Sequence, residues 1–236
     1  MAKQTVIKEN PEINIVSLSR YITAETSKKR TILKKLKFSD AMLYSRYANP
    51  RSAINKFLKD KDRKVQIFDD FIQKEKERLI DSDYKANDQK CSLECLDILK
   101  SKSDLLFASF KNNFSKKGLN KQFTHIYTYG VDVSLAPDYA IYSSESKKLE
   151  GFIKLNFSKK KKDRLTYQQG QLITGLIKEH LQEQFETELD RKMCIALDVY
   201  SAKVIVAPEA RTWIKDKPKL DTAFDEISRV WPFIQK

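Results

Sequence analysis

The order of predicted elements between residues 123 and 207 is the feature that most limits the fold. Four short segments with strand-like alternation of apolar and polar residues come first, at 123–129, 131–135, 139–142 and 151–157. One long amphipathic helix follows, and then a pair of strands over 194–207. Strands that pair around a single helix build an α/β or α+β core. The sequence therefore predicts a small mixed β-sheet flanked by helices.

The distribution of glycine predicts a different first half. All five glycines lie at or after residue 118. A long segment without glycine that is rich in Lys, Leu, Ile and Glu favours helices joined by short polar turns. We therefore expect a helical region over 1–117 and a mixed α/β core with a C-terminal helix over 118–236. The polar stretch 111–121 is the predicted boundary between them.

Apolar residues at helical spacing and turn-forming residues locate the individual helices. Asn49-Pro50 is expected to end one helix, because the residue before a proline avoids the helical conformation. The stretch 81–89 is polar and is expected to form a turn, and 216–218 is expected to precede the last helix. The helices predicted on these grounds cover 40–47, 51–58, 65–80, 92–110 and 219–230.

The charge of the chain predicts a polyanionic partner. The sequence has 45 Lys and Arg against 32 Asp and Glu, a net charge of +13. A positive field of this size attracts polyanions, of which nucleic acid (DNA or RNA) is the commonest, but an acidic protein partner would satisfy the same charge. Two basic runs, 27–37 and 159–164, are either nucleic-acid-binding elements or solvated faces. Their candidate binding residues are Lys28, Lys29, Arg30, Lys34 and Lys35, and Lys159, Lys160, Lys161, Lys162 and Arg164.

Several other classes of protein are disfavoured. No apolar run reaches the roughly 18 residues of a membrane span, and residues 1–10 lack an apolar signal region, so we expect a cytoplasmic protein. Cys91, Cys95 and Cys194 form no CxxC pair, and there are two histidines, which argues against structural zinc. Phosphate-binding GxxxxGK[ST] and GxGxxG patterns and the GxSxG nucleophile motif are missing from the sequence.

One arrangement of residues is similar to a known family. Pro137-Asp138 precedes the third strand segment, Lys154 lies in the fourth, and the helix that follows carries glutamines near its start. Over about residues 123–207 this order resembles the PD-(D/E)XK nuclease superfamily, particularly its RecB-like branch. The resemblance implies a restriction-endonuclease-like core. It also implies that Asp138 and a second acid bind Mg²⁺ or Mn²⁺, while Lys154 stabilises charge in the transition state.

The sequence departs from this pattern at the second acid. Phe152 stands two residues before Lys154, where the family has a carboxylate. Glu150, on the same predicted strand face, is a displaced substitute about 6 to 7 Å further along the strand. Asp198 is a further acid, which either faces the cleft of Asp138 or pairs with a lysine at the edge of the sheet. One carboxylate is a poor site for Mg²⁺, which needs several hard oxygen ligands.

Three functions remain open at this point. The first is a degenerate PD-(D/E)XK-like core that binds DNA or RNA and, by analogy, serves a phage, mobile-element or defence system; no cofactor is certain for it. The second is an active Mg²⁺-dependent endo- or exonuclease that uses Asp138, Glu150 and Lys154. The third is a basic assembly or regulatory subunit that binds an acidic protein partner.

Overall fold

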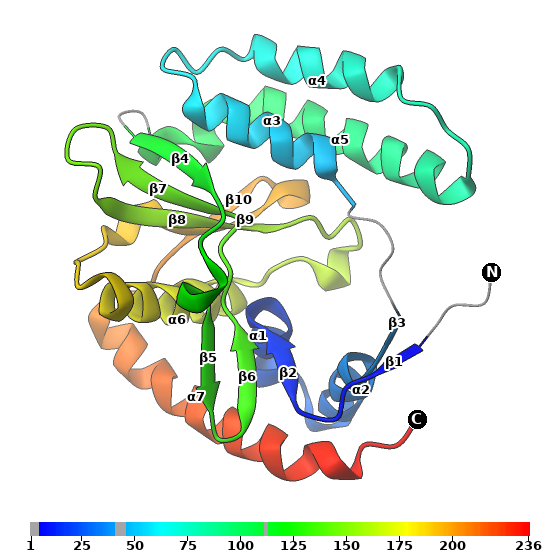
Figure 1. The fold of residues 1–236 in the computed structure, drawn as a ribbon, viewed down its shortest axis with the longest axis vertical. Helices are drawn as coiled ribbons and strands as arrows, with labels where there is room; N and C mark the ends of the chain where they lie inside the picture. The colour runs from blue at the N-terminus through cyan, green and yellow to red at the C-terminus, as the bar shows by residue number, and fades with distance from the viewer. Residues whose placement is uncertain (1–4, 41–45, 111–112) are drawn as a thin grey trace.

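The computed structural model describes residues 5–40, 46–110 and 113–236 and has a mixed α+β fold, which confirms the predicted class (Figure 1). The helices are α1 (Ile15–Thr23), α2 (Thr26–Lys37), α3 (Ala48–Lys59), α4 (Gln66–Lys76), α5 (Asp83–Leu106), α6 (Tyr167–Phe185) and α7 (Ala210–Val230). The strands are β1 (Thr5–Ile7), β2 (Glu12–Asn14), β3 (Phe38–Asp40), β4 (Asn113–Lys117), β5 (His125–Thr128), β6 (Val131–Ser134), β7 (Tyr139–Ser143), β8 (Leu149–Asn156), β9 (Cys194–Asp198) and β10 (Lys203–Val206).

The central sheet has the strand order β10-β9-β8-β7-β4. Strand β8 lies in its middle, antiparallel to β7 and parallel to β9, and α6 connects β8 to β9. Successive side chains of a strand point to opposite faces of the sheet. Phe152 therefore packs into one hydrophobic core and Ile153 and Leu155 into the other. Because helices cover both faces, this strand is apolar over most of its length.

The two cores are built by different parts of the chain. Helices α3, α4 and α5 supply the core above the sheet in Figure 1, whereas α1, α6 and α7 contribute to the core on its other face. The smaller sheet β2-β6-β5 joins this second core, with Ile13 of β2 paired to Val133 of β6. The N-terminal elements β2 and α1 thus contact elements that follow residue 118. The division of the chain at 117/118 stays a prediction.

Two polar stretches have more structure than we predicted. The stretch 111–121, expected to be the boundary between the two regions, contains β4, which pairs with β7 at the edge of the central sheet. The stretch 81–89, expected to be a turn, contains the start of α5, where the Ser82 hydroxyl accepts a hydrogen bond from the backbone of Lys85. In both stretches the partners that stabilise the element override a weak local pattern. Residues 41–45 of the helix predicted over 40–47 lie outside the described residues.

Two prolines that we expected to lie outside helices lie inside them. Pro50 occupies the first turn of α3, where a missing N–H is not needed for helical hydrogen bonds. Pro218 lies within α7, which begins at Ala210 rather than near residue 219. A proline at 218 leaves the carbonyl of Ile214 without its helical donor. Ile214 is exposed, so water can supply the missing hydrogen bond.

Gly151 is packed against the backbone that enters β9, which leads to a stability prediction. A Cβ at this position would lie 2.4 Å from the Met193 carbonyl oxygen. Backbone atoms cannot move aside as cheaply as a flexible side chain, so Gly151→Ala should lower the free energy of unfolding by about 1–3 kcal/mol. Urea unfolding measures this, with Lys148→Ala in the exposed β7–β8 connection as a control expected to change it by less than about 0.5 kcal/mol. Equal stability of the two variants would contradict the packing.

Candidate functional site

The structure brings together the two residues that carry the family resemblance. Asp138 lies at the start of β7 and Lys154 on the neighbouring strand β8, where Tyr139 is paired with Ile153. The Lys154 Nζ is 3.4 Å from the Asp138 Oδ2, and it donates a hydrogen bond of 2.7 Å to the carbonyl oxygen of Ala136. The two side chains are mostly buried and form an ion pair on one side of the sheet.

A second cation, which the sequence did not lead us to expect, binds the same carboxylate. The Arg51 Nη1 in α3 donates to the Asp138 Oδ1, and the backbone N–H of Leu155 donates to the Oδ2 at 2.7 Å. The guanidinium group of Arg51 also lies over the ring of Phe157, 4.9 Å from its centroid. Arg51 was missed because an arginine in the first turn of a helix carries no pattern that indicates a partner 87 residues away.

These contacts do not fit a divalent metal site. Both oxygens of Asp138 already accept an N–H hydrogen bond, and the Arg51 and Lys154 cations beside them would repel Mg²⁺ or Mn²⁺. Phe152, at the position of the second acid, is fully buried in the core. Within the described residues no group of three or more His, Cys, Asp or Glu side chains is placed to hold a metal ion. The donor set is that of a charge-compensated ion pair rather than a hard oxygen cage.

Tyr139 makes a further link between α3 and the sheet at this point. Its hydroxyl donates to the carbonyl oxygen of Arg51. Burial, and after it the charge of Asp138, raises the pKa of Tyr139 well above its ordinary value, so the hydroxyl keeps its proton. Together, Arg51, Asp138, Tyr139 and Lys154 attach the helical layer to the central sheet.

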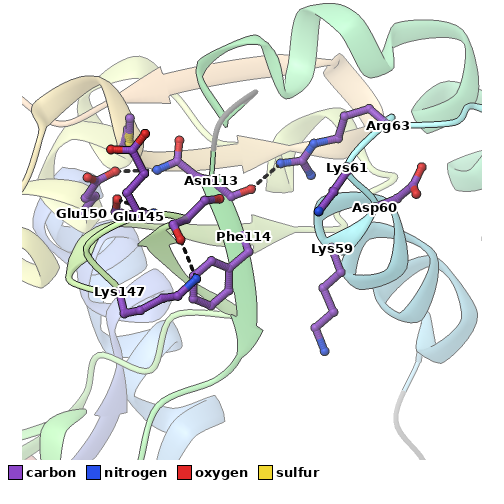
Figure 2. A pocket seen from close by; sticks show the side chains of 12 residues that line it. Lys59, Asp60, Lys61, Arg63, Asn113, Phe114, Glu145, Lys147 and Glu150 are labelled. Carbon is purple, nitrogen blue, oxygen red and sulfur yellow. Dashed lines mark hydrogen bonds between the residues drawn. The ribbon is translucent and has the colours of Figure 1, made fainter.

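Glu150, the proposed substitute ligand, contributes to a different part of the surface. Its carboxylate accepts a hydrogen bond from the Asn113 amide and faces a cavity of about 830 Å³ between the α3–α4 connection and the β7–β8 hairpin (Figure 2). Lys59 and Lys61 line the opposite wall of this cavity, and Asp138 and Lys154 are not among the lining residues. Four residues of strand, roughly 13 Å, separate Glu150 from Lys154. The structure therefore does not bring Glu150 to Asp138.

The basic loop, residues 159–164, is anchored at both ends by a buried carboxylate. Asp198 is fully buried at the end of β9. Its Oδ2 accepts hydrogen bonds from the Asn156 amide at 2.7 Å and from the backbone N–H of Leu165 at 2.8 Å. Asn156 precedes the basic loop and Leu165 directly follows it. Its Oδ1 accepts from the Ser201 hydroxyl at 2.7 Å. Neither predicted role of Asp198, facing Asp138 or pairing with a lysine, matches these partners.

Other contacts hold the basic loop from the side. The Arg20 guanidinium in α1 donates to the carbonyl oxygen of Asp163 at 2.6 Å and to the Ser158 hydroxyl at 3.3 Å. At the start of the loop, the Lys159 ammonium pairs with Glu94 of α5 at 2.6 Å. A 3₁₀ turn over Lys161–Asp163 orders the middle. These contacts leave the backbone of the loop little freedom to move.

The structure divides the predicted binding residues into engaged and unengaged groups. Lys28 pairs with Glu25, Lys29 with Glu226 and Lys159 with Glu94, and Arg164 donates to a backbone carbonyl. The remaining six are exposed and have no ion pair in the part of the chain that the structure describes: Lys160, Lys161 and Lys162 in the basic loop, and Arg30, Lys34 and Lys35 on α2. Helix α1, which binds the basic loop through Arg20, directly precedes α2.

Comparisons with models of protein families and with curated proteins give no match for this chain. The resemblance to the PD-(D/E)XK superfamily therefore stays a prediction that rests on residue order and on the meeting of Asp138 with Lys154. Among the described residues, no helix is both long enough and apolar enough to cross a membrane.

The three cysteines lie in the interior. Cys91, Cys95 and Cys194 are free thiols and all three are buried. Burial, the largest effect in each case, raises the pKa of Cys95 and of Cys194 to about 12. Because the thiolate is the nucleophilic form, these two thiols are unreactive at neutral pH. They pack as small apolar side chains.

Loss of the Asp138 charge should destabilise the protein. Asp138→Asn leaves the Arg51 and Lys154 cations close together and without a carboxylate, so we expect a loss of about 1–3 kcal/mol in the free energy of unfolding. Guanidinium unfolding measures it. The matched control is Asp225→Asn on α7, which removes an exposed pair with Arg229 and should cost less than about 0.5 kcal/mol. If both variants lose equally little, the Asp138 cluster does not attach α3 to the sheet.

Divalent metal should leave the stability of the protein unchanged. A ligand that binds the native state raises its melting temperature, and at about 10 mM metal a millimolar site would already do so. Because Arg51 and Lys154 neutralise Asp138, we expect the same melting temperature with Mg²⁺, with Mn²⁺ and with chelator. Thermal denaturation by circular dichroism tests this. A stabilisation by Mn²⁺ that disappears in Asp138→Asn would contradict this expectation and show that Asp138 binds metal.

Proposed function

We propose that the protein binds nucleic acid through the basic loop, on a core related to PD-(D/E)XK nucleases that has lost its metal site. The observation that carries the proposal is the state of Lys160, Lys161 and Lys162. All three are exposed and have no ion pair within the described residues, on a backbone fixed by Asp198 and Arg20. Several unneutralised cations held on a rigid support suit the phosphates of a polyanion.

The chemistry of the loop favours binding to the backbone of the nucleic acid. Lysine ammonium groups are mobile point charges that contact phosphates without reading bases. The net charge of +13 adds a long-range field that attracts a polyanion from solution. Arg30, Lys34 and Lys35 are three further exposed cations on α2, the helix that follows α1. We infer binding that depends strongly on salt concentration and weakly on sequence.

Cleavage of the bound strand is not favoured by the contacts of Asp138. Two-metal phosphodiester cleavage needs carboxylates that are free to hold ions on both sides of the scissile phosphate. Asp138 instead compensates Arg51 and Lys154, and Glu150 is bonded to Asn113 at another cavity. In this proposal the Asp138 cluster keeps the sheet and α3 together, and the basic loop contacts the nucleic acid.

Reversal of the charge in the basic loop should abolish binding. The triple variant Lys160→Glu, Lys161→Glu and Lys162→Glu removes about three phosphate contacts. We expect the slope of log K against log salt to fall by about 2 to 3 units, with loss of detectable binding at physiological salt. Fluorescence anisotropy with labelled DNA and RNA measures both. The matched control is Lys192→Glu, Arg211→Glu and Lys215→Glu, three exposed positions elsewhere with the same change of net charge.

The control distinguishes binding at the basic loop from attraction by the net charge of the whole protein. If the two triple variants bind equally well, the basic loop is not the binding site. If the wild-type protein binds no DNA or RNA at low salt but forms a stoichiometric complex with an acidic protein, the third function described from the sequence replaces this proposal.

A further inference from the structure

The residue next to the basic loop carries an exposed aromatic ring. Tyr167 is the first residue of α6, three positions after Arg164, and 56% of its surface is exposed. Thr166 and Gln168 on either side of it are exposed as well. Most tyrosine and phenylalanine rings of a folded protein are more buried than this one. The exposed ring thus follows the basic loop closely in the chain.

Neighbouring contacts hold this ring in place. The Tyr167 hydroxyl accepts a hydrogen bond of 3.0 Å from the Gln171 side-chain amide, one turn further along α6. A capping box between Thr166 and Gln169 fixes the first turn of the helix, and Gln169 also donates to Thr23 of α1. The ring therefore has a defined orientation before any ligand binds, which lowers the entropic cost of stacking on it.

The basic loop and Tyr167 are close enough for one short stretch of polynucleotide to reach both. Tyr167 is five positions after Lys162, so their Cα atoms are at most about 18 Å apart. That distance is the reach of a few nucleotides of an extended strand. The Thr166 hydroxyl accepts from the backbone N–H of Gln169, and the dipole of α6 adds positive potential at this end of the helix. Phosphates can thus contact the lysines while a neighbouring base reaches the ring.

We propose that the basic loop and Tyr167 together bind single-stranded nucleic acid, with phosphates on Lys160, Lys161 and Lys162 and an unpaired base stacked on the Tyr167 ring. The lysines alone would bind single and double strands alike. A base inside a duplex is already stacked on its neighbours and offers no free face to a protein ring. The ring therefore selects the single strand. This inference rests on the proposed function and adds the class of substrate to it.

The test compares ligands that share phosphates and differ in their bases. Fluorescence anisotropy is measured at one salt concentration with a single-stranded oligo-dT, an oligo-U, a DNA duplex and an abasic strand, all of equal length. For wild-type protein we expect tighter binding to oligo-dT and oligo-U than to the abasic strand or the duplex. Tyr167→Ala should weaken binding to the two base-carrying single strands by about 5- to 100-fold and leave binding to the abasic strand unchanged.

Two further variants distinguish stacking from other effects. Tyr167→Phe keeps the ring and loses only the hydrogen bond with Gln171, so it should bind nearly as wild type does. Tyr127→Ala removes a 78% exposed ring on β5, outside the basic loop, and should have no effect. Equal affinity for single strand and duplex, with no effect of Tyr167→Ala, would overturn the stacking proposal and leave the proposed function in place. Binding that survives the loop charge reversal would overturn both.

Discussion

The buried carboxylate of Asp198 is the interaction on which the functional surface depends. A fully buried charge is costly unless hydrogen bonds compensate for the lost water. Asp198 obtains this compensation from Asn156, from the backbone of Leu165 and from Ser201. These three groups belong to the end of β8, the end of the basic loop and the β9–β10 connection. The hydrogen bonds that compensate Asp198 therefore also fix where the loop leaves the sheet and where α6 begins.

A second carboxylate, Asp138, has the corresponding role on the other side of β8. It holds Arg51 of α3 and Lys154 of β8, and Tyr139 beside it bonds to the backbone of Arg51. The same pair of residue types that would hold a metal and a phosphate in a nuclease here stabilises the contact between two layers. The two carboxylates thus have different structural roles. One attaches the helices to the sheet, and the other presents lysines to the solvent.

Elements with a strong local pattern were predictable, and elements that depend on distant partners were not. The β7–β8 hairpin and α6 follow from alternation and helical spacing over many residues. Strand β4 was assigned to the predicted boundary because Asn, Ser and the first glycine interrupt the helical pattern there, and its sequence NFSKK has a single apolar residue. It is a strand because its backbone pairs with β7 and α3 packs against it. Asp138 and Lys154 were named from the sequence and lie 3.4 Å apart, whereas the partner Arg51 and the distance of Glu150 from this pair were not expected.

The sequence by itself determined the α+β class, the apolar middle strand, the positive charge and the position of the basic runs. Each of these depends on composition or on neighbours within a few residues. Only the tertiary structure decided which cations are free and which are used, because the deciding contacts join residues far apart in the chain. Asp138 meets Arg51 across 87 positions, and Arg20 binds the basic loop across 143. A carboxylate available to metal and one already neutralised have the same letter in a sequence, and only the folded chain places the neighbouring charges that distinguish them.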